Sequence, residues 1–208
     1  MTKIKNFRIQ LRTREVIRTL KTCLDPWTPE HEAIVSQKIE QFFPSIQTAA
    51  LYTTLTRSTA EKATSLPLSE KAIAVSVVIV GIGPLLDDLK KQLDTQENNL
   101  DSHWISAIQS ESLHQSMSFA MRLLTDQAKE EECMLGTPID IHEALLVPTL
   151  STLLGIERIG LQLDTENPQL PSHVRLAWIE WTALPKKTTS RKSAAAPTSS
   201  RVSVAAAL

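Results

Sequence analysis

The sequence predicts an α+β fold, in which one domain combines helices with an antiparallel or mixed sheet. Segments with strand-like alternation and segments with helical spacing follow one another without a repeating strand–helix–strand unit. The chain has 208 residues, 42% of them hydrophobic, which is enough for one sizeable buried core.

A folded domain is expected over residues 1–184, followed by a disordered tail over 185–208. The tail consists mainly of Ala, Ser and Thr, with scattered basic residues and no acidic one, so it has little to bury. The remaining chain is net acidic, which argues against nucleic acid as the main partner.

No membrane partner is expected, because Gly81 and Pro84 interrupt the longest apolar run well short of the roughly 18 residues that span a bilayer. The basic N-terminal segment has no apolar stretch behind it and does not resemble a signal peptide. We therefore expect a cytoplasmic location.

The first part of the chain predicts two strands separated by two helices. Residues 6–10 alternate apolar and polar side chains, and residues 13–24 have apolar side chains at helical spacing. Thr28 and Pro29 provide the N-cap and first residue of a second helix. Residues 48–57, rich in Thr and apolar side chains, predict a strand.

The second part predicts a buried central strand, three helices and two closing strands. In chain order these are a strand through 75–80, a helix from Pro84, helices over about 99–130 and 141–154, and strands at 158–163 and 173–181. Pro148 is expected to kink or break the last helix, and Gly155 to end it. Each closing strand alternates and is expected to have one exposed face, with Trp178 and Trp181 on opposite faces.

The loop Gly81-Ile82-Gly83-Pro84 follows an apolar strand, as the glycine-rich loop of a dinucleotide-binding site does. That motif needs a third small residue where this chain has Leu86. Pro84 also removes a backbone N–H donor that would face a pyrophosphate. The sequence therefore argues against a dinucleotide site.

No catalytic or metal-ligating constellation is predicted. The five histidines occur in none of the paired spacings that hold a metal ion, and no serine lies on a nucleophile turn. Cys23 and Cys133 are far apart and are expected to be reduced thiols.

Four parts of the chain, in this order, resemble the activation domain of cobalamin-dependent methionine synthase and its short stand-alone relatives. They are FRIQLRTREVIRTL with TPEHEAIVSQKIEQF, then AVSVVIVGIGPLLDDLKKQL, LDSHWISAIQSESLHQSM and IERIGLQLDTENPQLPSHVRLAWIEW, which together cover most of 6–182. The resemblance implies a single α+β unit with a twisted, mainly antiparallel sheet flanked by helices.

It also implies a function. Domains of that family bind S-adenosylmethionine and dock over the cobalamin of a separate corrinoid protein, whose inactive Co(II) form is then reductively methylated. The implied cofactors are therefore S-adenosylmethionine and a cobalamin held by a partner protein.

The chain departs from the family at the ligand loop, which carries an Arg and then Pro-Gly-Tyr in the family but reads ECMLGTPIDIHE here. The only tyrosine, Tyr52, is on an early strand. By resemblance, the ligand-binding candidates are residues of this loop and of the loop between the closing strands: Gly136, Thr137, Pro138, Leu170 and Pro171. Glu131 or Glu132 is a candidate for holding the ligand's amino group.

The long helix departs as well, with Ser106, Gln109 and His114 where short relatives tend to have Asp, Gly and Glu. Two hypotheses remain open. The chain either assists reactivation of a corrinoid protein, or it keeps the fold, has lost S-adenosylmethionine binding and acts only as a binding partner.

Overall fold

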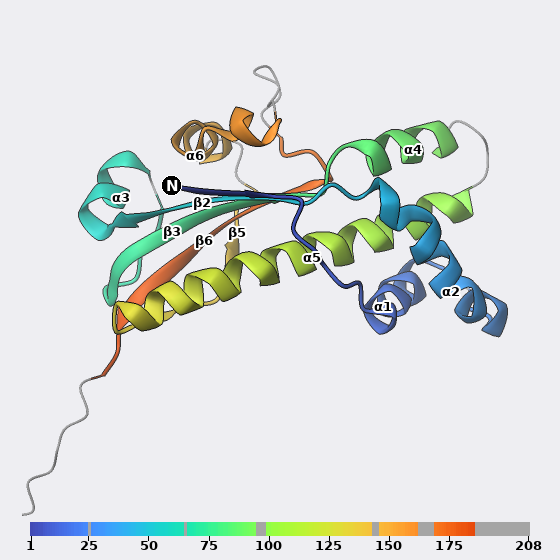
Figure 1. Cartoon of the computed structure of the whole chain (residues 1–208), viewed down its shortest axis with the longest axis horizontal. Helices are drawn as coiled ribbons and strands as arrows, with labels where there is room; N and C mark the ends of the chain where they lie inside the picture. Colours follow the sequence, from blue (N-terminus) through green and yellow to red (C-terminus); the bar gives the residue numbers. More distant parts are fainter. Residues whose placement is uncertain (25, 65, 95–98, 143–145, 162–168, 186–208) are drawn as a thin grey trace, which may run out of the picture.

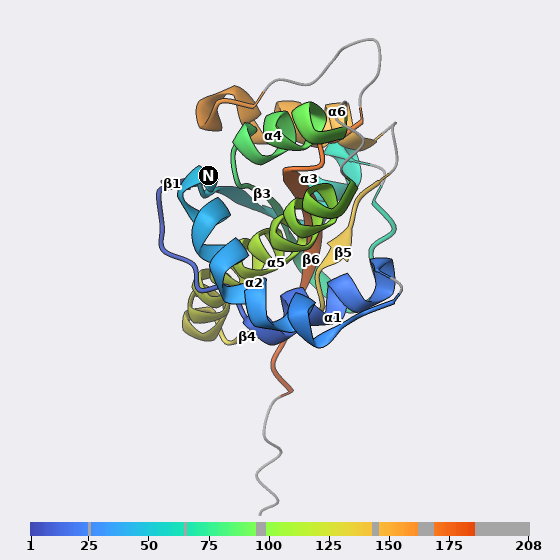
Figure 2. The same ribbon diagram turned by 90° about the vertical axis from the view of Figure 1, so that its right-hand side faces the viewer.

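The computed structural model describes residues 1–185 except 25, 65, 95–98, 143–145 and 162–168. The predicted disordered tail therefore lies outside the described residues apart from Pro185. The predicted α+β class is confirmed, with helices packed on both faces of an antiparallel sheet (Figures 1 and 2). Among the helices of the described chain, none is long and apolar enough to cross a bilayer.

The elements follow in this order: β1 (Thr2–Lys5), α1 (Thr13–Cys23), α2 (Pro29–Phe42), η1 (Phe43–Ser45), β2 (Ala49–Thr56), α3 (Arg57–Ala63), β3 (Ala72–Gly81), α4 (Leu85–Asp94), α5 (Asn99–Glu130), β4 (Cys133–Leu135), β5 (Ile139–Asp140), α6 (Leu146–Leu154), η2 (Ile156–Ile159) and β6 (Val174–Ala183).

The sheet has the strand order β1-β2-β3-β6-β4, and β5 also pairs with β6. Every paired strand runs antiparallel to its neighbour. β3 lies between β2 and β6, with Val78 opposite both Tyr52 and Ala177. The prediction of a buried central strand is therefore confirmed.

Side-chain alternation gives the sheet two buried faces. On one face, residues such as Ile79 and Trp178 pack against α6 and η2; on the other, residues such as Val78 and Trp181 pack against the C-terminal half of α5. Trp178 and Trp181 thus lie on opposite faces, as predicted. The predicted exposed face of this strand is wrong, because helices cover both sides (Figure 1).

Helix α5 is longer than the sheet that it covers. Its 32 residues span about 48 Å, whereas the ten residues of β3 span about 33 Å. The overhanging N-terminal half packs against α1, α2 and α4, where Trp104 and Ile108 meet Leu20 and Leu86 in a third apolar cluster. Figure 1 shows these three helices gathered beyond the end of the sheet.

The strand predicted at residues 6–10 is wrong. β1 ends at Lys5, because Asn6 adopts a left-handed backbone conformation with φ of 55°. The Phe7 ring stacks on Phe119 of α5 at 4.1 Å between ring centroids. The Phe7 carbonyl accepts a hydrogen bond from the Thr48 hydroxyl at 2.6 Å. Because of these contacts, the segment after β1 leaves the sheet and leads to α1.

The strand predicted at 158–163 is also wrong where the structure describes it, and residues 162–163 lie outside the described part. Ile156–Ile159 forms a 3-10 turn between Gly155 and Gly160, which both adopt left-handed conformations. The turn buries both of its isoleucines. Gly155 ends α6 as predicted, but Pro148 lies in the first turn of that helix and does not break it, because a proline is tolerated there.

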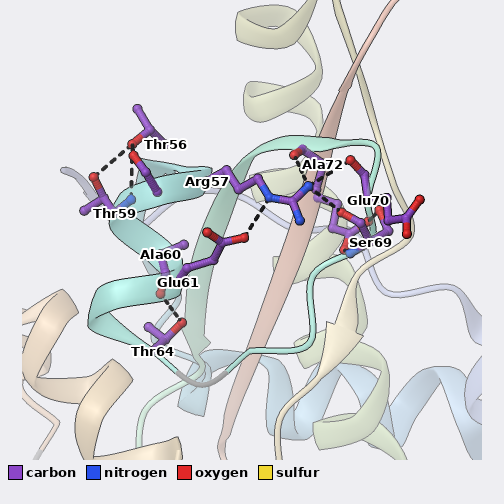
Figure 3. Close-up of polar contacts among 11 residues, drawn as sticks. Thr56, Arg57, Thr59, Ala60, Glu61, Thr64, Ser69, Glu70 and Ala72 are labelled. Atoms are coloured by element: carbon purple, nitrogen blue, oxygen red, sulfur yellow. Dashed lines mark hydrogen bonds and ion pairs between the residues drawn. The ribbon is translucent and has the colours of Figure 1, made fainter.

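Arg57 closes the loop between α3 and β3 (Figure 3). Its Nη1 donates to the carbonyls of Ser69, Glu70 and Ala72 at 2.8–3.1 Å, and its Nε donates to Glu61 at 2.7 Å. One guanidinium can bridge four acceptors because its donors form a planar fork. The side chain therefore fixes the entry into the central strand.

Candidate functional site

The predicted ligand loop forms a turn between β4 and β5, close against β6. The Gly136 N–H donates to the Glu180 carbonyl at 2.8 Å. A Cβ at Gly136 would lie 3.5 Å from the same oxygen, so the turn backbone approaches the edge of β6 closely. Gly136 therefore positions the turn, in which Thr137 is exposed and Pro138 is partly exposed.

Thr137 and Pro138 line a cavity of about 390 Å³ between this turn and α5, which we call the sheet-edge groove. Its other lining residues come from α5 and from the start of β6: His114, Met117, Ser118, Met121 and Arg175. The volume lies within the range of small-molecule sites in proteins. Two methionines give the groove an adaptable apolar wall.

Arg175 provides the charge of the groove. Its guanidinium forms a bidentate ion pair with Asp140 of β5, with Nε–Oδ1 and Nη2–Oδ2 distances of 2.7 and 3.0 Å. Both side chains are about a third exposed. A partly exposed ion pair of this kind contributes little to stability and can exchange its partners for those of a ligand.

The other predicted residues lie elsewhere. Pro171 lines a separate cavity at the end of the sheet, and Leu170 packs on the α6 face. β4 and β5 pair with the part of β6 from Ala177 to Ala183, several residues beyond Pro171. The structure therefore does not bring the two predicted loops together in one cavity.

Glu131 and Glu132 are exposed and precede β4, outside the lining of the groove. The Glu132 carbonyl accepts from the Leu184 N–H, at the opposite end of β6 from Arg175. Neither carboxylate lies among the residues that line the groove with Thr137 and Pro138.

The three departures on the long helix have different surroundings. Ser106 donates to the Ser102 carbonyl within α5, at 2.9 Å. His114 is exposed and lines the groove. Gln109 is buried and donates through its amide to Asp87 of α4, so it joins two helices.

Asp87 belongs to a buried polar cluster that the sequence did not reveal. Besides Gln109, it accepts from the Ser172 hydroxyl at 2.6 Å, and its second oxygen lies 2.7 Å from Nδ1 of His173. Burial raises the pKa of Asp87, but hydrogen bonds from His173, Ser172 and Gln109 outweigh it and hold that pKa below its usual value. The carboxylate is therefore ionised at neutral pH.

Arg175 and the two methionines were also missed. The available signal was a charged residue near the start of a mainly apolar strand, on the face that alternation shares with Ala177 and Ile179. The Asp87–His173 pair had no such signal, because 86 residues separate its members. In the described part of the chain, no three His, Cys, Asp or Glu side chains gather in a way that could hold a metal ion.

No protein-family model matches the sequence, and no curated protein matches it either. Among solved structures, the chain is similar to the MetH reactivation domain bound to AdoHcy. The match covers 86% of this chain and 77% of that one, with a TM-score of 0.55 and 10% sequence identity. At 10% identity such a similarity concerns the fold alone, and the chain has a fold similar to that of the MetH reactivation domain.

Proposed function

We propose that this chain is a divergent relative of the methionine synthase reactivation domain. In this proposal the chain binds an S-adenosyl ligand in its sheet-edge groove and assists reactivation of a corrinoid protein. The observation that carries the proposal is the combination of this fold with a groove of ligand size at the turn Gly136–Pro138. The solved structure with the similar fold is itself bound to AdoHcy.

The composition of the groove suits such a ligand. The partly exposed Met121, with the buried Met117 beside it in the lining, offers a polarisable apolar wall for a purine. The exposed Thr137 hydroxyl can donate to or accept from a ribose.

The ion pair at the edge of the groove suits the amino-acid end of the ligand. A zwitterionic amino acid presents a carboxylate and an ammonium group. Arg175 would donate to the carboxylate in bidentate geometry, and Asp140 would accept from the ammonium group. Because both residues are partly exposed, this exchange would not leave a buried charge unpaired.

When bound, S-adenosylmethionine supplies an activated methyl group, and the cobalamin belongs to the partner protein. The chain would contribute binding and orientation, because no catalytic constellation lies in the described part of the groove. His114, at the outer edge of α5, would be positioned to contact the docked partner.

Isothermal titration with S-adenosylmethionine and with AdoHcy tests the ligand. We expect saturable binding of both, and Arg175→Gln should weaken it about tenfold, which corresponds to about 1.4 kcal/mol. Arg122→Gln, on an exposed position of α5 that does not line the groove, is the matched control and should bind normally. The absence of binding heat at millimolar ligand would contradict the ligand part of the proposal.

A pull-down with an isolated cobalamin-binding domain tests the partner. It should be performed with methylated and with Co(II) cobalamin, and we expect retention of the Co(II) form. If neither form is retained, the partner part of the proposal is wrong, whatever the calorimetry shows.

A second candidate is a non-catalytic partner of a corrinoid protein that has lost S-adenosylmethionine. It is favoured by the position of Tyr52, the only tyrosine of the sequence, which is buried in β2 and does not line the groove. Under this alternative, the cobalamin-binding domain is retained while both calorimetric titrations are flat.

A further inference from the structure

We infer that the sheet-edge groove binds AdoHcy, a neutral thioether, more tightly than S-adenosylmethionine, which carries a positively charged sulfonium. The inference rests on the proposed function, since it names the charge state of the ligand that the same groove prefers. Methyl transfer converts the sulfonium into the thioether, so the two ligands are the substrate and the product of one reaction. The groove would therefore favour the product.

The ion pair at the edge of the groove leaves no charge over for a sulfonium. Arg175 and Asp140 are together neutral, and so is the zwitterionic amino-acid end of the ligand. In the proposed exchange, Arg175 takes the carboxylate of the ligand and Asp140 takes its ammonium group, so these four charges are compensated in pairs. The positive charge on the sulfur of S-adenosylmethionine then needs a separate partner.

The described lining of the groove provides no such partner. Besides Arg175, its residues are His114, Met117, Ser118, Met121, Thr137 and Pro138. None of these side chains is acidic, and an imidazole is either neutral or positively charged. The two hydroxyl groups offer a sulfonium only neutral dipoles. Transfer of a cation from water to such surroundings is unfavourable without a counter-charge.

The acidic and aromatic side chains of α5 around the groove-lining stretch are engaged elsewhere. Glu111, on one side of it in the sequence, is only 5% exposed and forms its ion pair with the segment before α1. Asp126, on the other side, pairs with a lysine of its own helix at 3.2 Å. The ring of Phe119 stacks on Phe7, and the guanidinium of Arg122 already lies 5.8 Å from its centroid. None of these groups belongs to the groove lining.

The apolar part of the lining suits a thioether. The partly exposed Met121 and the buried Met117 beside it form a polarisable wall. An uncharged sulfur can contact this wall without the desolvation cost that a sulfonium would meet. The product should therefore compete effectively with the substrate, and occupancy of the groove should respond to the ratio of the two ligands.

Isothermal titration of the full-length protein with AdoHcy and, separately, with S-adenosylmethionine tests the preference. We expect AdoHcy to bind at least about threefold more tightly. Equal affinities, or tighter binding of S-adenosylmethionine, would overturn the inference and leave the proposed function standing. Absence of binding by both ligands would overturn the ligand part of the proposed function, and the inference with it.

A pair of matched substitutions on α5 separates the effect of charge from that of the size of the methyl group. His114→Glu places a carboxylate in the lining and should tighten binding of S-adenosylmethionine relative to AdoHcy at least about threefold. His103→Glu makes the same change about three turns away, outside the described lining, and should leave the ratio of the two affinities unchanged.

Two results with these variants would overturn the inference. An unchanged ratio in His114→Glu would mean that the preference does not come from the charge of the lining. Equal changes of the ratio in both variants would mean general charge attraction rather than a property of the groove. His114 is exposed and His103 is partly exposed, so both variants should fold, and binding of AdoHcy to each variant reports whether its groove is intact.

Discussion

The guanidinium Nε of Arg12 lies 2.9 Å from Oε1 of Glu111, 99 residues further along the chain. The second carboxylate oxygen accepts from Nη2 of Arg12 at 3.3 Å, and Gln115 donates to the first at 2.7 Å. The Glu111 side chain is only 5% exposed, whereas that of Arg12 is half exposed. This contact joins the segment before α1 to the middle of α5.

Loss of the Arg12 side chain should destabilise the protein, because it leaves the buried Glu111 carboxylate without its charged partner. We expect Arg12→Ala to lower the urea midpoint of unfolding several times more than Arg14→Ala. Arg14 is exposed in the first turn of α1, two residues further on, and serves as the control. Similar midpoints for the two variants would contradict a structural role for the ion pair.

Stability should fall in acid through Glu111 and Asp87. Burial raises both pKa values, but hydrogen bonds from Arg12 to Glu111 and from His173 to Asp87 outweigh it and lower them. A carboxyl group whose pKa is lower in the folded than in the unfolded state stabilises the protein at every pH above its unfolded-state pKa of about 4. This stabilisation is lost as the pH falls through the folded-state pKa.

The free energy of unfolding, measured in urea from pH 6 to pH 3, should therefore decline mainly below about pH 4.5. Glu111→Gln removes one of the two groups and should make the decline shallower. An unchanged slope in that variant would exclude Glu111 as a contributor.

Gly83→Ala should destabilise the loop after β3. Gly83 has a φ of 76°, and a Cβ there would lie 3.0 Å from Cβ of Gln47. We expect a loss of about 1–3 kcal/mol in the free energy of unfolding. Gly160→Ala has a similar φ of 81° but meets open space, so it should cost less. Equal costs would mean that the Gln47 contact contributes nothing.

Arg57→Lys should destabilise the segment that leads into β3. A lysine cannot reach the three carbonyls and Glu61 together, and the loss is expected to be about 1–3 kcal/mol. Hydrogen exchange at residues 69–72 should accelerate. The control is Arg18→Lys, which changes an exposed ion pair with Glu15 and should leave exchange unaffected. Unchanged hydrogen exchange at residues 69–72 in Arg57→Lys would contradict a structural role for the Arg57 guanidinium.

Local sequence signals were sufficient to predict those elements whose structure depends mainly on their own residues. Thr28 and Pro29 predicted the start of α2, and the structure adds a hydrogen bond from the Thr28 N–H to the His31 ring at 3.2 Å. The apolar run before Gly81 predicted β3, because a strand buried on both faces needs apolar side chains throughout.

The misses depend on contacts that no local pattern contains. Alternation through Phe7 and Ile9 is strand-like, yet the Phe119 ring and the left-handed Asn6 divert the chain. The partners of Arg12 and His173 lie 99 and 86 residues away, so only the folded sheet and the overhanging α5 bring them together. The order of the segments predicted the fold, while the lining of both cavities required the structure.

The two edges of the sheet have a consequence for behaviour at high protein concentration. β1 is only four residues long, carries Lys3 and Lys5, and ends at the left-handed Asn6. At the other edge, β6 is covered by two short strands interrupted at the Gly136 turn. Short, charged or interrupted edges oppose the addition of a strand from another molecule. The fold therefore protects its apolar central strands from edge-to-edge aggregation.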